Sequence, residues 1–159
     1  MAQLSLHSPV GDLTITEEDG KIISLDWGWV PEQWQSTTPL LEEAVEQLNR
    51  YFDAEIGDFD LPLDPPGTEF QKKVWAEMLK IPAGKTKSYG EIAKILKSAA
   101  QPVGTACGAN PIPIIIPCHR ILAAGGKMGG YSGDGGLETK KALLRLENAL
   151  PNEQQLLDI

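Results

Sequence analysis

Residues 114–122 read Ile-Ile-Ile-Pro-Cys-His-Arg-Ile-Leu, so that an apolar run leads directly into a thiol, an imidazole and a guanidinium. A thiol attacks only as its thiolate, and a free cysteine has a pKa of about 8.5, so a neighbouring base or positive charge is needed to activate it. His119 and Arg120 can each supply such a group to Cys118. The alternative is that Cys118 is a small hydrophobe in the protein interior. The stretch therefore predicts a buried segment that carries a candidate nucleophile.

The composition is that of a globular protein with a real core. The chain has 159 residues, of which 42% are hydrophobic, enough for one domain or two small lobes. No run approaches the roughly 18 apolar residues of a membrane span, and the opening Met-Ala-Gln begins no signal region, so we expect a cytoplasmic protein without a membrane partner. Two cysteines and two histidines are too few and too badly spaced for a structural zinc site. An intracellular setting also disfavours a disulfide between Cys107 and Cys118.

Charge is distributed unevenly along the chain. The net charge of -8 argues at first against a nucleic-acid partner, because contacts to phosphate need clustered Lys and Arg. Residues 1–66 hold 14 acids against two bases, a net charge of -12, whereas residues 67–147 hold 12 bases against six acids, a net charge of +6. An ordinary solvated surface is one explanation of this asymmetry, and a basic lobe that binds nucleic acid is the other.

The first part of the chain predicts a small antiparallel sheet with one helix. Apolar and polar residues alternate over residues 3–29, with turn residues at 8–11 and 19–20. Thr38 and Pro39 are suited to the N-cap and first position of a helix that continues to about Phe52 with an apolar stripe. Residues 57–67, rich in Pro and Gly, predict a linker.

The remainder predicts a mostly helical lobe. Helices are expected over residues 69–80, 88–96, 102–109 and 137–150, and Ser88 and Glu91 have the spacing of a capping box. The two short central helices form a candidate helix-turn-helix. Residues 103–109 contain no Arg, Asn or Gln to read base edges in the major groove. Their small side chains instead permit the close approach that a minor groove about 6 Å wide demands.

These elements define an α/β (α+β) protein of two parts. Residues 1–66 form an N-terminal lobe with the small sheet and a helix, and residues 67–159 form a C-terminal domain that carries the helix-turn-helix and the candidate site. Glycines surround residues 131–132, which favours either a loop whose backbone lines a pocket or a plain flexible loop.

Several motifs of the second domain resemble one protein family. The sequence Asn-Pro-Ile-Pro-Ile-Ile-Ile-Pro-Cys-His-Arg at residues 110–120 is similar to the active-site signature of the methylated-DNA–protein-cysteine methyltransferases, the O6-alkylguanine-DNA alkyltransferases. The resemblance continues through residues 67–75, 81–86, 88–93 and 129–132. It covers residues 67–148 strongly and residues 1–66, a ribonuclease H-like lobe in that family, weakly.

The resemblance implies that the protein repairs DNA by accepting an alkyl group from O6-alkylguanine, or from O4-alkylthymine, on Cys118. His119 matches the base that takes the thiol proton through a bound water, and Glu147 matches the acid that orients the imidazole. Tyr89 matches a hydroxyl donor to the ring nitrogen of the leaving purine, and Asn110 matches the residue that braces the cysteine. Because water does not hydrolyse a thioether, each molecule should act once, with neither metal nor cofactor.

The family pattern also implies contacts to the flipped base and to DNA. Residues matched to the base pocket are Gly104, Pro113, Tyr131 and Ser132, and those matched to the DNA surface are Gln101, Thr105, Ala106, Gly108 and Arg120. The expected partner is double-stranded DNA, bound in the minor groove by a monomer with little sequence specificity. Gln101 departs from the family, which has arginine there to fill the space of the flipped nucleotide. We therefore expect flipping that is retained but weaker, because glutamine carries no charge and stacks less well.

Three other functions fit parts of the sequence. A non-catalytic alkyltransferase-like protein would bind the lesion only, but such proteins have tryptophan at the position of Cys118. A thiol hydrolase could use Cys118, His119 and Glu147, although proteases do not place the histidine directly after the cysteine. A helix-turn-helix regulator would need base-reading residues in its second helix, and residues 103–109 lack them.

Overall fold

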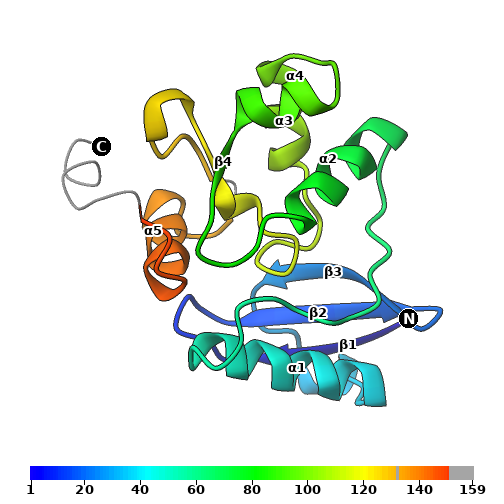
Figure 1. Ribbon diagram of the computed structural model, residues 1–159. Helices are drawn as coiled ribbons and strands as arrows, with labels where there is room; N and C mark the ends of the chain where they lie inside the picture. The colour runs from blue at the N-terminus through cyan, green and yellow to red at the C-terminus, as the bar shows by residue number, and fades with distance from the viewer. Residues whose placement is uncertain (132, 151–159) are drawn as a thin grey trace. The chain divides into compact units, whose positions relative to one another are not determined.

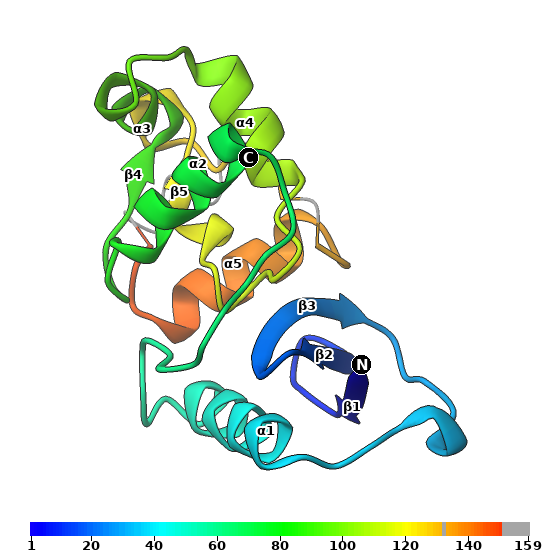
Figure 2. The ribbon, with the colours of Figure 1, turned by 90° about the vertical axis from the view of Figure 1, so that its right-hand side faces the viewer.

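The computed structural model describes residues 1–131 and 133–150, which fold into two compact units (Figures 1 and 2). The first unit contains Met1–Pro66 and also Pro111–Ile115, and the second contains Gly67–Asn110 and the described residues from Ile116 onward. A short segment just before the Pro-Cys-His-Arg motif therefore belongs to the first unit. Among the described residues, no helix is both long enough and apolar enough to cross a membrane.

The first unit is a three-stranded antiparallel sheet with a helix along one face (Figure 2). Its elements are β1 (Ala2–Leu6), β2 (Leu13–Glu18), β3 (Lys21–Trp27), the 3-10 helix η1 (Glu32–Trp34) and α1 (Pro39–Phe52). Leu13, Ile15 and Leu25 of the predicted alternation have almost no exposed surface, whereas at the start of β3 Ile22 is buried in place of Ile23. The register pairs Ile15 with Leu25, which stacks these apolar side chains on one face of the sheet.

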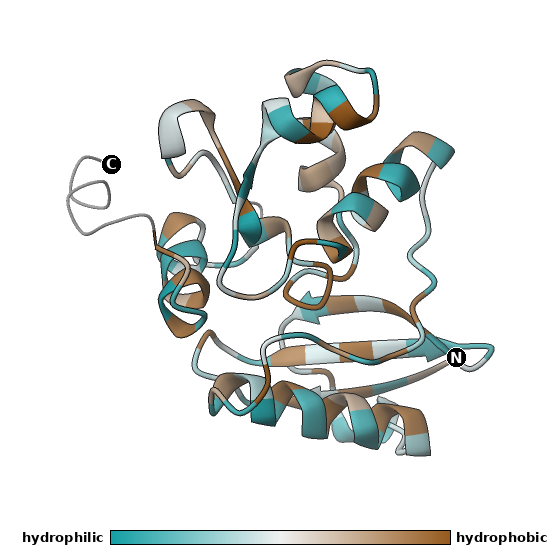
Figure 3. Cartoon of the chain, in the orientation of Figure 1, coloured by the Kyte–Doolittle hydropathy of each residue, from teal (hydrophilic) through white to brown (hydrophobic). Residues whose placement is uncertain are grey.

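Helix α1 begins as its sequence predicts. The Thr38 hydroxyl accepts a hydrogen bond from the Leu41 amide at 3.1 Å, and Pro39 occupies the first turn. Figure 3 shows polar and apolar residues alternating along this helix. Its apolar stripe, which includes Leu48 and Tyr51, is buried against the sheet and fixes the helix by burial rather than by propensity.

The stretch predicted as a linker, residues 57–67, is partly built into the sheet. The Ile22 amide donates to the Pro62 carbonyl at 2.8 Å, and the Ile22 carbonyl accepts from the Asp64 amide at 2.8 Å, forming a parallel bridge between Ile22 and Leu63. The Pro111 carbonyl accepts from the Leu25 amide at 2.9 Å, which attaches the segment 111–115 to β3. Backbone groups at the sheet edge need partners, and these two segments supply them.

The second unit is mostly helical and contains the predicted helix-turn-helix as α3 and α4 (Figure 1). Its elements are α2 (Glu69–Leu79), β4 (Lys87–Ser88), α3 (Tyr89–Ile95), α4 (Ala100–Gly108), η2 (Cys118–Arg120), β5 (Ile121–Leu122), η3 (Ala124–Gly126) and α5 (Leu137–Leu146). The buried Trp75 of α2 joins this core to α4, because its indole N–H donates to the Ala106 carbonyl at 2.9 Å.

Helices α2 and α3 of this unit begin at side-chain caps, whereas α4 and α5 begin without one. Ser88 accepts from the Glu91 amide at 3.0 Å as expected, and α2 has a full capping box between Thr68 and Gln71. Helix α4 begins at Ala100, two residues before the predicted start. Proline lacks only an amide hydrogen, and none of the first-turn amides has a partner within the helix, so Pro102 is accommodated anywhere in that turn.

Helix α5 ends at Leu146, four residues before the predicted end. Asn148 adopts a φ of 56°, and its amide donates to the Arg145 carbonyl at 3.1 Å. The Ala149 amide donates to the Leu144 carbonyl at 2.9 Å, which completes a Schellman motif. The apolar pattern continues past the helix because Ala149 and Leu150 still pack on Leu144 after the turn. The helix end leaves Glu147 at the C-cap.

Candidate active site

Cys118 is placed by a tight turn. Pro117 has φ -82° and ψ 69°, and the Cys118 amide donates to the Ile116 carbonyl at 2.8 Å, the geometry of an inverse γ-turn. The Asn110 side chain also donates to the Ile116 carbonyl, at 2.8 Å, so the residue predicted to brace the cysteine holds the turn before it. Cys118 then begins η2, and the short parallel pairing of β5 with β4 brings the start of α3 beside it.

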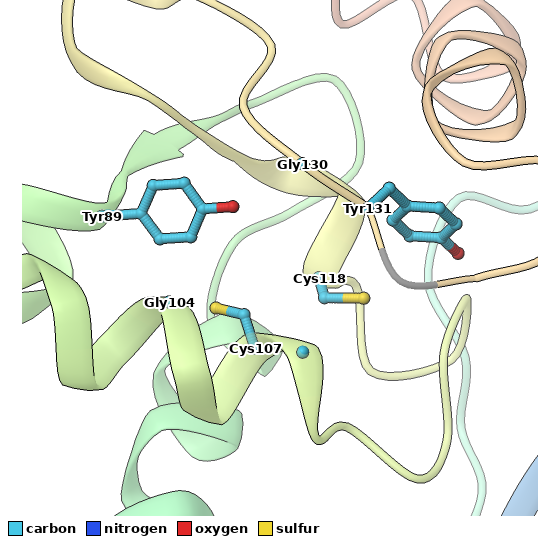
Figure 4. Close-up of a pocket in the computed structure, with 7 residues that line it drawn as sticks. Tyr89, Gly104, Cys107, Cys118, Gly130 and Tyr131 are labelled. Atoms are coloured by element: carbon cyan, nitrogen blue, oxygen red, sulfur yellow. The ribbon is translucent and has the colours of Figure 1, made fainter.

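A pocket of about 310 Å³ opens beside Cys118 (Figure 4). Tyr89 enters it from the start of α3, Cys107 from α4, and Gly130 with Tyr131 from the glycine-rich loop. The described lining residues are Tyr89, Gly104, Cys107, Gly108, Cys118, Gly130 and Tyr131. The loop backbone therefore forms part of a pocket wall, as one of the two interpretations of the glycines predicted.

His119 and Glu147 form a buried pair behind the cysteine. The imidazole Nε2 lies 2.7 Å from Glu147 Oε2, and the two side chains are 0% and 1% exposed. A carboxylate only accepts, so Nε2 carries the proton and Nδ1 has the free lone pair. Burial lowers the pKa of His119 despite the carboxylate, which keeps the imidazole neutral near pH 7. Nδ1 is buried without a hydrogen-bond partner among the described residues. This nitrogen is therefore available as a proton acceptor.

Arg120 is a partner of Glu147, which corrects the prediction that it contacts DNA. Its Nε and one terminal nitrogen donate to the carboxylate at 2.8 and 3.0 Å, and the other terminal nitrogen donates to the Ile81 carbonyl at 2.6 Å. The residue is only 3% exposed, so phosphate cannot reach it. A bidentate guanidinium holds the carboxylate in a fixed orientation, and thereby fixes the imidazole.

Burial raises the pKa of the Cys118 thiol. Hydrogen bonding by Asn110 and the positive charge of Lys140 act in the opposite direction and favour the thiolate. In the resting pocket Cys118 is therefore a thiol, and attack requires that its proton be removed. His119, the next residue in the chain, has a neutral imidazole and is the candidate base for that step.

Tyr89 faces the same pocket as a proton donor. Burial, together with negative charge on Cys107 or Cys118, raises its pKa to about 12. The phenol thus keeps its proton throughout the neutral pH range. Burial raises the pKa of Tyr131 in the same way. Tyr89 and Tyr131 can therefore donate hydrogen bonds to a ligand in which negative charge develops.

The predicted DNA-contact residues on α4 divide into two groups. Gln101, Thr105 and Gly108 are exposed, as a surface that meets DNA requires. Ala106 is 2% exposed and faces the core, so the prediction that it contacts DNA is wrong. A helix presents only one face, and Ala106 lies on the same buried side as Val103.

The remaining predicted pocket residues are placed as follows. Gly104 lines the pocket next to Tyr89, whose ring lies 3.9 Å from the position that a Cβ at residue 104 would occupy. Pro113 is buried in the first unit with Pro111–Ile115 and is not among the described lining residues, which corrects its assignment to the pocket. Ser132 lies outside the described residues. No group of three or more His, Cys, Asp or Glu side chains within the described residues could hold a metal ion.

Two features of the site were missed by sequence reasoning. Cys107 is a second pocket thiol, and burial raises its pKa to about 12. Lys140 is a fully buried lysine of α5 whose ammonium is bonded to backbone carbonyls. Spacing along a helix gives no signal for either role, because the pocket wall and the carbonyl acceptors come from other parts of the chain.

Comparison with known proteins covers nearly the whole chain. The DNA binding domain of 6-O-methylguanine DNA methyltransferase matches residues 69–149, and its ribonuclease-like domain matches residues 3–65. The methylated-DNA–protein-cysteine methyltransferase of Mycobacterium tuberculosis (strain ATCC 25618 / H37Rv) is 43% identical over 152 residues, which covers 91% of each chain. The protein of the same name from Methanosarcina acetivorans is 43% identical over 151 residues, covering 90% of this chain and 96% of the relative.

Solved structures agree with these sequence matches. The crystal structure of the O6-methylguanine methyltransferase of Mycobacterium tuberculosis has a TM-score of 0.81 and 39% identity and covers 99% of both chains. The structure of Mycobacterium tuberculosis OGT in complex with DNA has a TM-score of 0.83 and 41% identity, covering 99% of this chain and 100% of the other.

A pocket cysteine next to a buried histidine–glutamate pair defines a protein that uses a thiol nucleophile, either for group transfer or for hydrolysis. The family matches decide between these two. The chain belongs to the 6-O-methylguanine DNA methyltransferase family. Its α+β fold is the one expected from the sequence.

Proposed function

We propose that this protein repairs DNA by transferring the alkyl group of O6-alkylguanine to Sγ of Cys118. The observation that carries the proposal is the buried set of Cys118, which lines the pocket, His119 and Glu147, in which the imidazole has a fixed tautomer and an Nδ1 without a hydrogen-bond partner among the described residues. The family match supports alkyl transfer rather than lesion binding alone.

The reaction is a displacement at the alkyl carbon. The thiol proton passes to Nδ1 of His119 through a water, and the thiolate forms a bond to the alkyl carbon as the bond from that carbon to O6 breaks. The electron pair leaves on the guanine, where the phenol of Tyr89 donates to the ring nitrogen that gains negative charge. The product is a thioether on Cys118, and a thioether is not hydrolysed by water. Each molecule therefore acts once.

The substrate must leave the base stack to reach Cys118, at a cost of a few kcal/mol. Helix α4 presents Gln101, Thr105 and Gly108 on its exposed side, and the small residues there suit a minor groove. A monomer bound in this way would read the backbone and the groove width rather than the base sequence. Access to DNA and a reduced thiol at Cys118 both favour the cytoplasm.

Gln101 is exposed in the first turn of α4 and is proposed to enter the space left by the flipped nucleotide. We predict that Gln101→Arg binds duplex DNA more tightly and repairs faster, because guanidinium adds charge and a larger stacking plane. Fluorescence anisotropy and single-turnover repair kinetics would measure the two effects. Gln101→Lys, which adds charge without the planar group, is the matched control. Equal affinity and rate in wild type and Gln101→Arg would contradict the proposed place of this residue.

Intact-protein mass spectrometry tests the proposed function. Equimolar protein and a duplex with one O6-methylguanine should give a mass gain of one methyl that maps to Cys118 and stops at one equivalent. Cys118→Ala should show no gain, whereas Cys107→Ala, which removes the other pocket thiol, should still be methylated. Binding to the lesion without any mass gain would instead mean that the protein only binds the lesion. Methylation of Cys107 would contradict the proposal that Cys118 is the acceptor.

A further inference from the structure

Lys140 is a fully buried cation that the transfer step described above does not use. It lies in the middle of α5, and its ammonium donates to the carbonyls of Ile121 at 2.7 Å, Met128 at 2.5 Å and Gly130 at 3.0 Å. These bonds use all three hydrogens of the ammonium. One of the acceptors belongs to β5, directly after the Cys-His-Arg turn, and the other two belong to the loop that forms a wall of the pocket.

A buried ammonium is costly, and the same helix position could be filled by an apolar side chain. Desolvation lowers the pKa of Lys140 to about 8, which shows that burial disfavours the charged form of the side chain. Leu143 and Leu144 on the same helix pack with almost no exposure, which shows that this side of α5 is otherwise an ordinary core. The charge therefore calls for an explanation other than packing.

The titratable groups that the Lys140 charge acts on all belong to the site. Its positive charge lowers the pKa of Cys118 on η2 and of Cys107 on α4, and it also lowers the pKa of His119. The first effect favours the thiolate that attacks. The last effect favours the neutral imidazole that accepts the proton. The base must be neutral before it takes the thiol proton, and the thiolate is the form that then attacks the alkyl carbon.

We propose that Lys140 is a positioning residue for alkyl transfer: its ammonium fixes the loop wall at Gly130 against β5 and supplies the positive charge that favours a thiolate on Cys118. This inference rests on the proposed function for its meaning. The carbonyls of Met128 and Gly130 hold the ammonium at the loop wall, so its charge has a fixed position relative to that wall. A thiolate on Cys118 is then stabilised by this fixed positive charge.

The test measures the thiolate without relying on DNA. The full chain is treated with iodoacetamide at pH 7, where Lys140 still carries its charge, and the rate of modification of Cys118 is followed by peptide mass spectrometry, which separates it from Cys107. Lys140→Met should lower this rate roughly tenfold, because it lowers the thiolate fraction by that factor. Lys141→Met, which removes a neighbouring charge paired at 3.6 Å with the exposed Glu138, should leave the rate unchanged.

Two further variants separate charge from structure. Lys140→Arg keeps the charge and should be modified at Cys118 at pH 7 at a rate close to that of wild type. Lys140→Gln keeps amide donors without a charge and should slow the modification as Lys140→Met does. This pair also decides the question if Lys140→Met does not fold. Equal rates for wild type, Lys140→Arg and Lys140→Gln would overturn the proposal and leave Lys140 a structural residue.

Transfer kinetics complete the design. With a saturating O6-methylguanine duplex, Lys140→Gln should show a roughly tenfold lower single-turnover rate at pH 7 and unchanged affinity for undamaged DNA. Weaker binding at an unchanged rate would contradict the positioning role. If wild type takes no methyl group from DNA while the iodoacetamide rates at pH 7 still differ as expected, the proposed function fails and the effect of Lys140 on the thiol stands.

Discussion

Two buried cations flank the Cys118–His119 turn, and they are used in different ways. Arg120 forms an ion pair with a carboxylate. Two of its hydrogen bonds reach Glu147 and a third reaches the backbone carbonyl of Ile81, and the ion pair orients the imidazole. Lys140 donates its hydrogen bonds to backbone carbonyls, and no carboxylate of the described residues is among the groups that shift its pKa. The charge of Arg120 is therefore neutralised by Glu147, whereas the charge of Lys140 acts on the pocket thiols.

Replacing one member of the Glu147–Arg120 pair should lower the free energy of unfolding much more than replacing both members. We predict that Glu147→Gln destabilises the protein by about 3 kcal/mol, because the guanidinium is left buried without a counter-charge. The double variant Glu147→Gln/Arg120→Met should be more stable than Glu147→Gln alone, since no unpaired charge remains. Urea unfolding of wild type, both single variants and the double variant forms a double-mutant cycle. Additive losses would show that the two residues act independently.

His119 should make the fold sensitive to acid. Its folded pKa lies below the ordinary value of 6.5, so below pH 6.5 the unfolded chain binds a proton that the native chain does not. The free energy of unfolding should then fall as pH drops from 6.5 toward the folded pKa, by at most about 1.4 kcal/mol per pH unit from this group. Urea unfolding at pH 7.5, 6.5 and 5.5 measures it. His119→Gln should flatten the profile, and identical slopes in the two proteins would rule out this origin.

At the scale of elements, the end of α5 matters as much as its face. The helix stops at Leu146 because Asn148 takes a left-handed conformation, and this turn leaves the Glu147 carboxylate directed at His119 and Arg120. Glu147 still has right-handed helical φ and ψ, so the preceding turns of α5 direct its side chain, and the chain turns away at the next residue.

We predict that Asn148→Ala costs about 1 kcal/mol of stability, because alanine lacks the local hydrogen bonding that lets asparagine adopt a positive φ. Asn148→Gly, which adopts this φ without strain, should be as stable as wild type or slightly more so. The residue is exposed, so packing does not confuse the comparison. Thermal or urea unfolding of the three proteins provides the measurement, and an alanine variant as stable as the glycine variant would show that the turn does not depend on this conformation.

The fold was predictable wherever local chemistry acts alone. Alternation over residues 3–29 and the Thr38 cap gave the sheet and α1, since burial of one face and a side-chain cap are both written in consecutive residues. The end of α5 was not predictable in this way, because Ala149 and Leu150 stay apolar to pack after the Schellman turn. The edge pairing of Leu63 with Ile22 was also invisible, since it uses backbone groups that every residue has.

The same distinction applies to the site. Cys118, His119 and Glu147 were identified because family motifs contain them, and the structure brings the histidine and the acid into contact. Arg120 was assigned to DNA because the family resemblance matches it to a structural and DNA-proximal position, and nothing in the sequence shows that it is buried. Lys140 escaped notice because its acceptors are carbonyls from β5 and a loop, which only the folded chain places around it. Long-range polar contacts of this kind leave no periodic pattern.

For the whole molecule, the surface charge differs from the charge counted in the sequence, because some charged side chains are buried. Residues 67–147 hold 12 bases, but Arg120 and Lys140 are buried, so their charges are not available to phosphate. The exposed bases of the second unit include Lys94 and Lys97, which lie at the end of α3 and in the turn that leads to α4. The acids of the first unit include Glu42 and Glu46 on the exposed side of α1. DNA binding should therefore depend on where charge lies rather than on the net charge of -8.

Opposite charge changes in the two units should have unequal effects on DNA affinity. We predict that Lys94→Gln/Lys97→Gln weakens binding to undamaged duplex and reduces the salt dependence, by up to about 0.9 in the slope of log K against log salt for each lost phosphate contact. Glu42→Gln/Glu46→Gln, which changes the net charge by the same amount in the opposite direction, should leave that slope unchanged. Anisotropy titrations between about 50 and 200 mM salt give both slopes. Equal and opposite shifts in affinity without a change of slope would mean that the global field of the protein, and not contacts made by the α3–α4 region, governs its attraction to DNA.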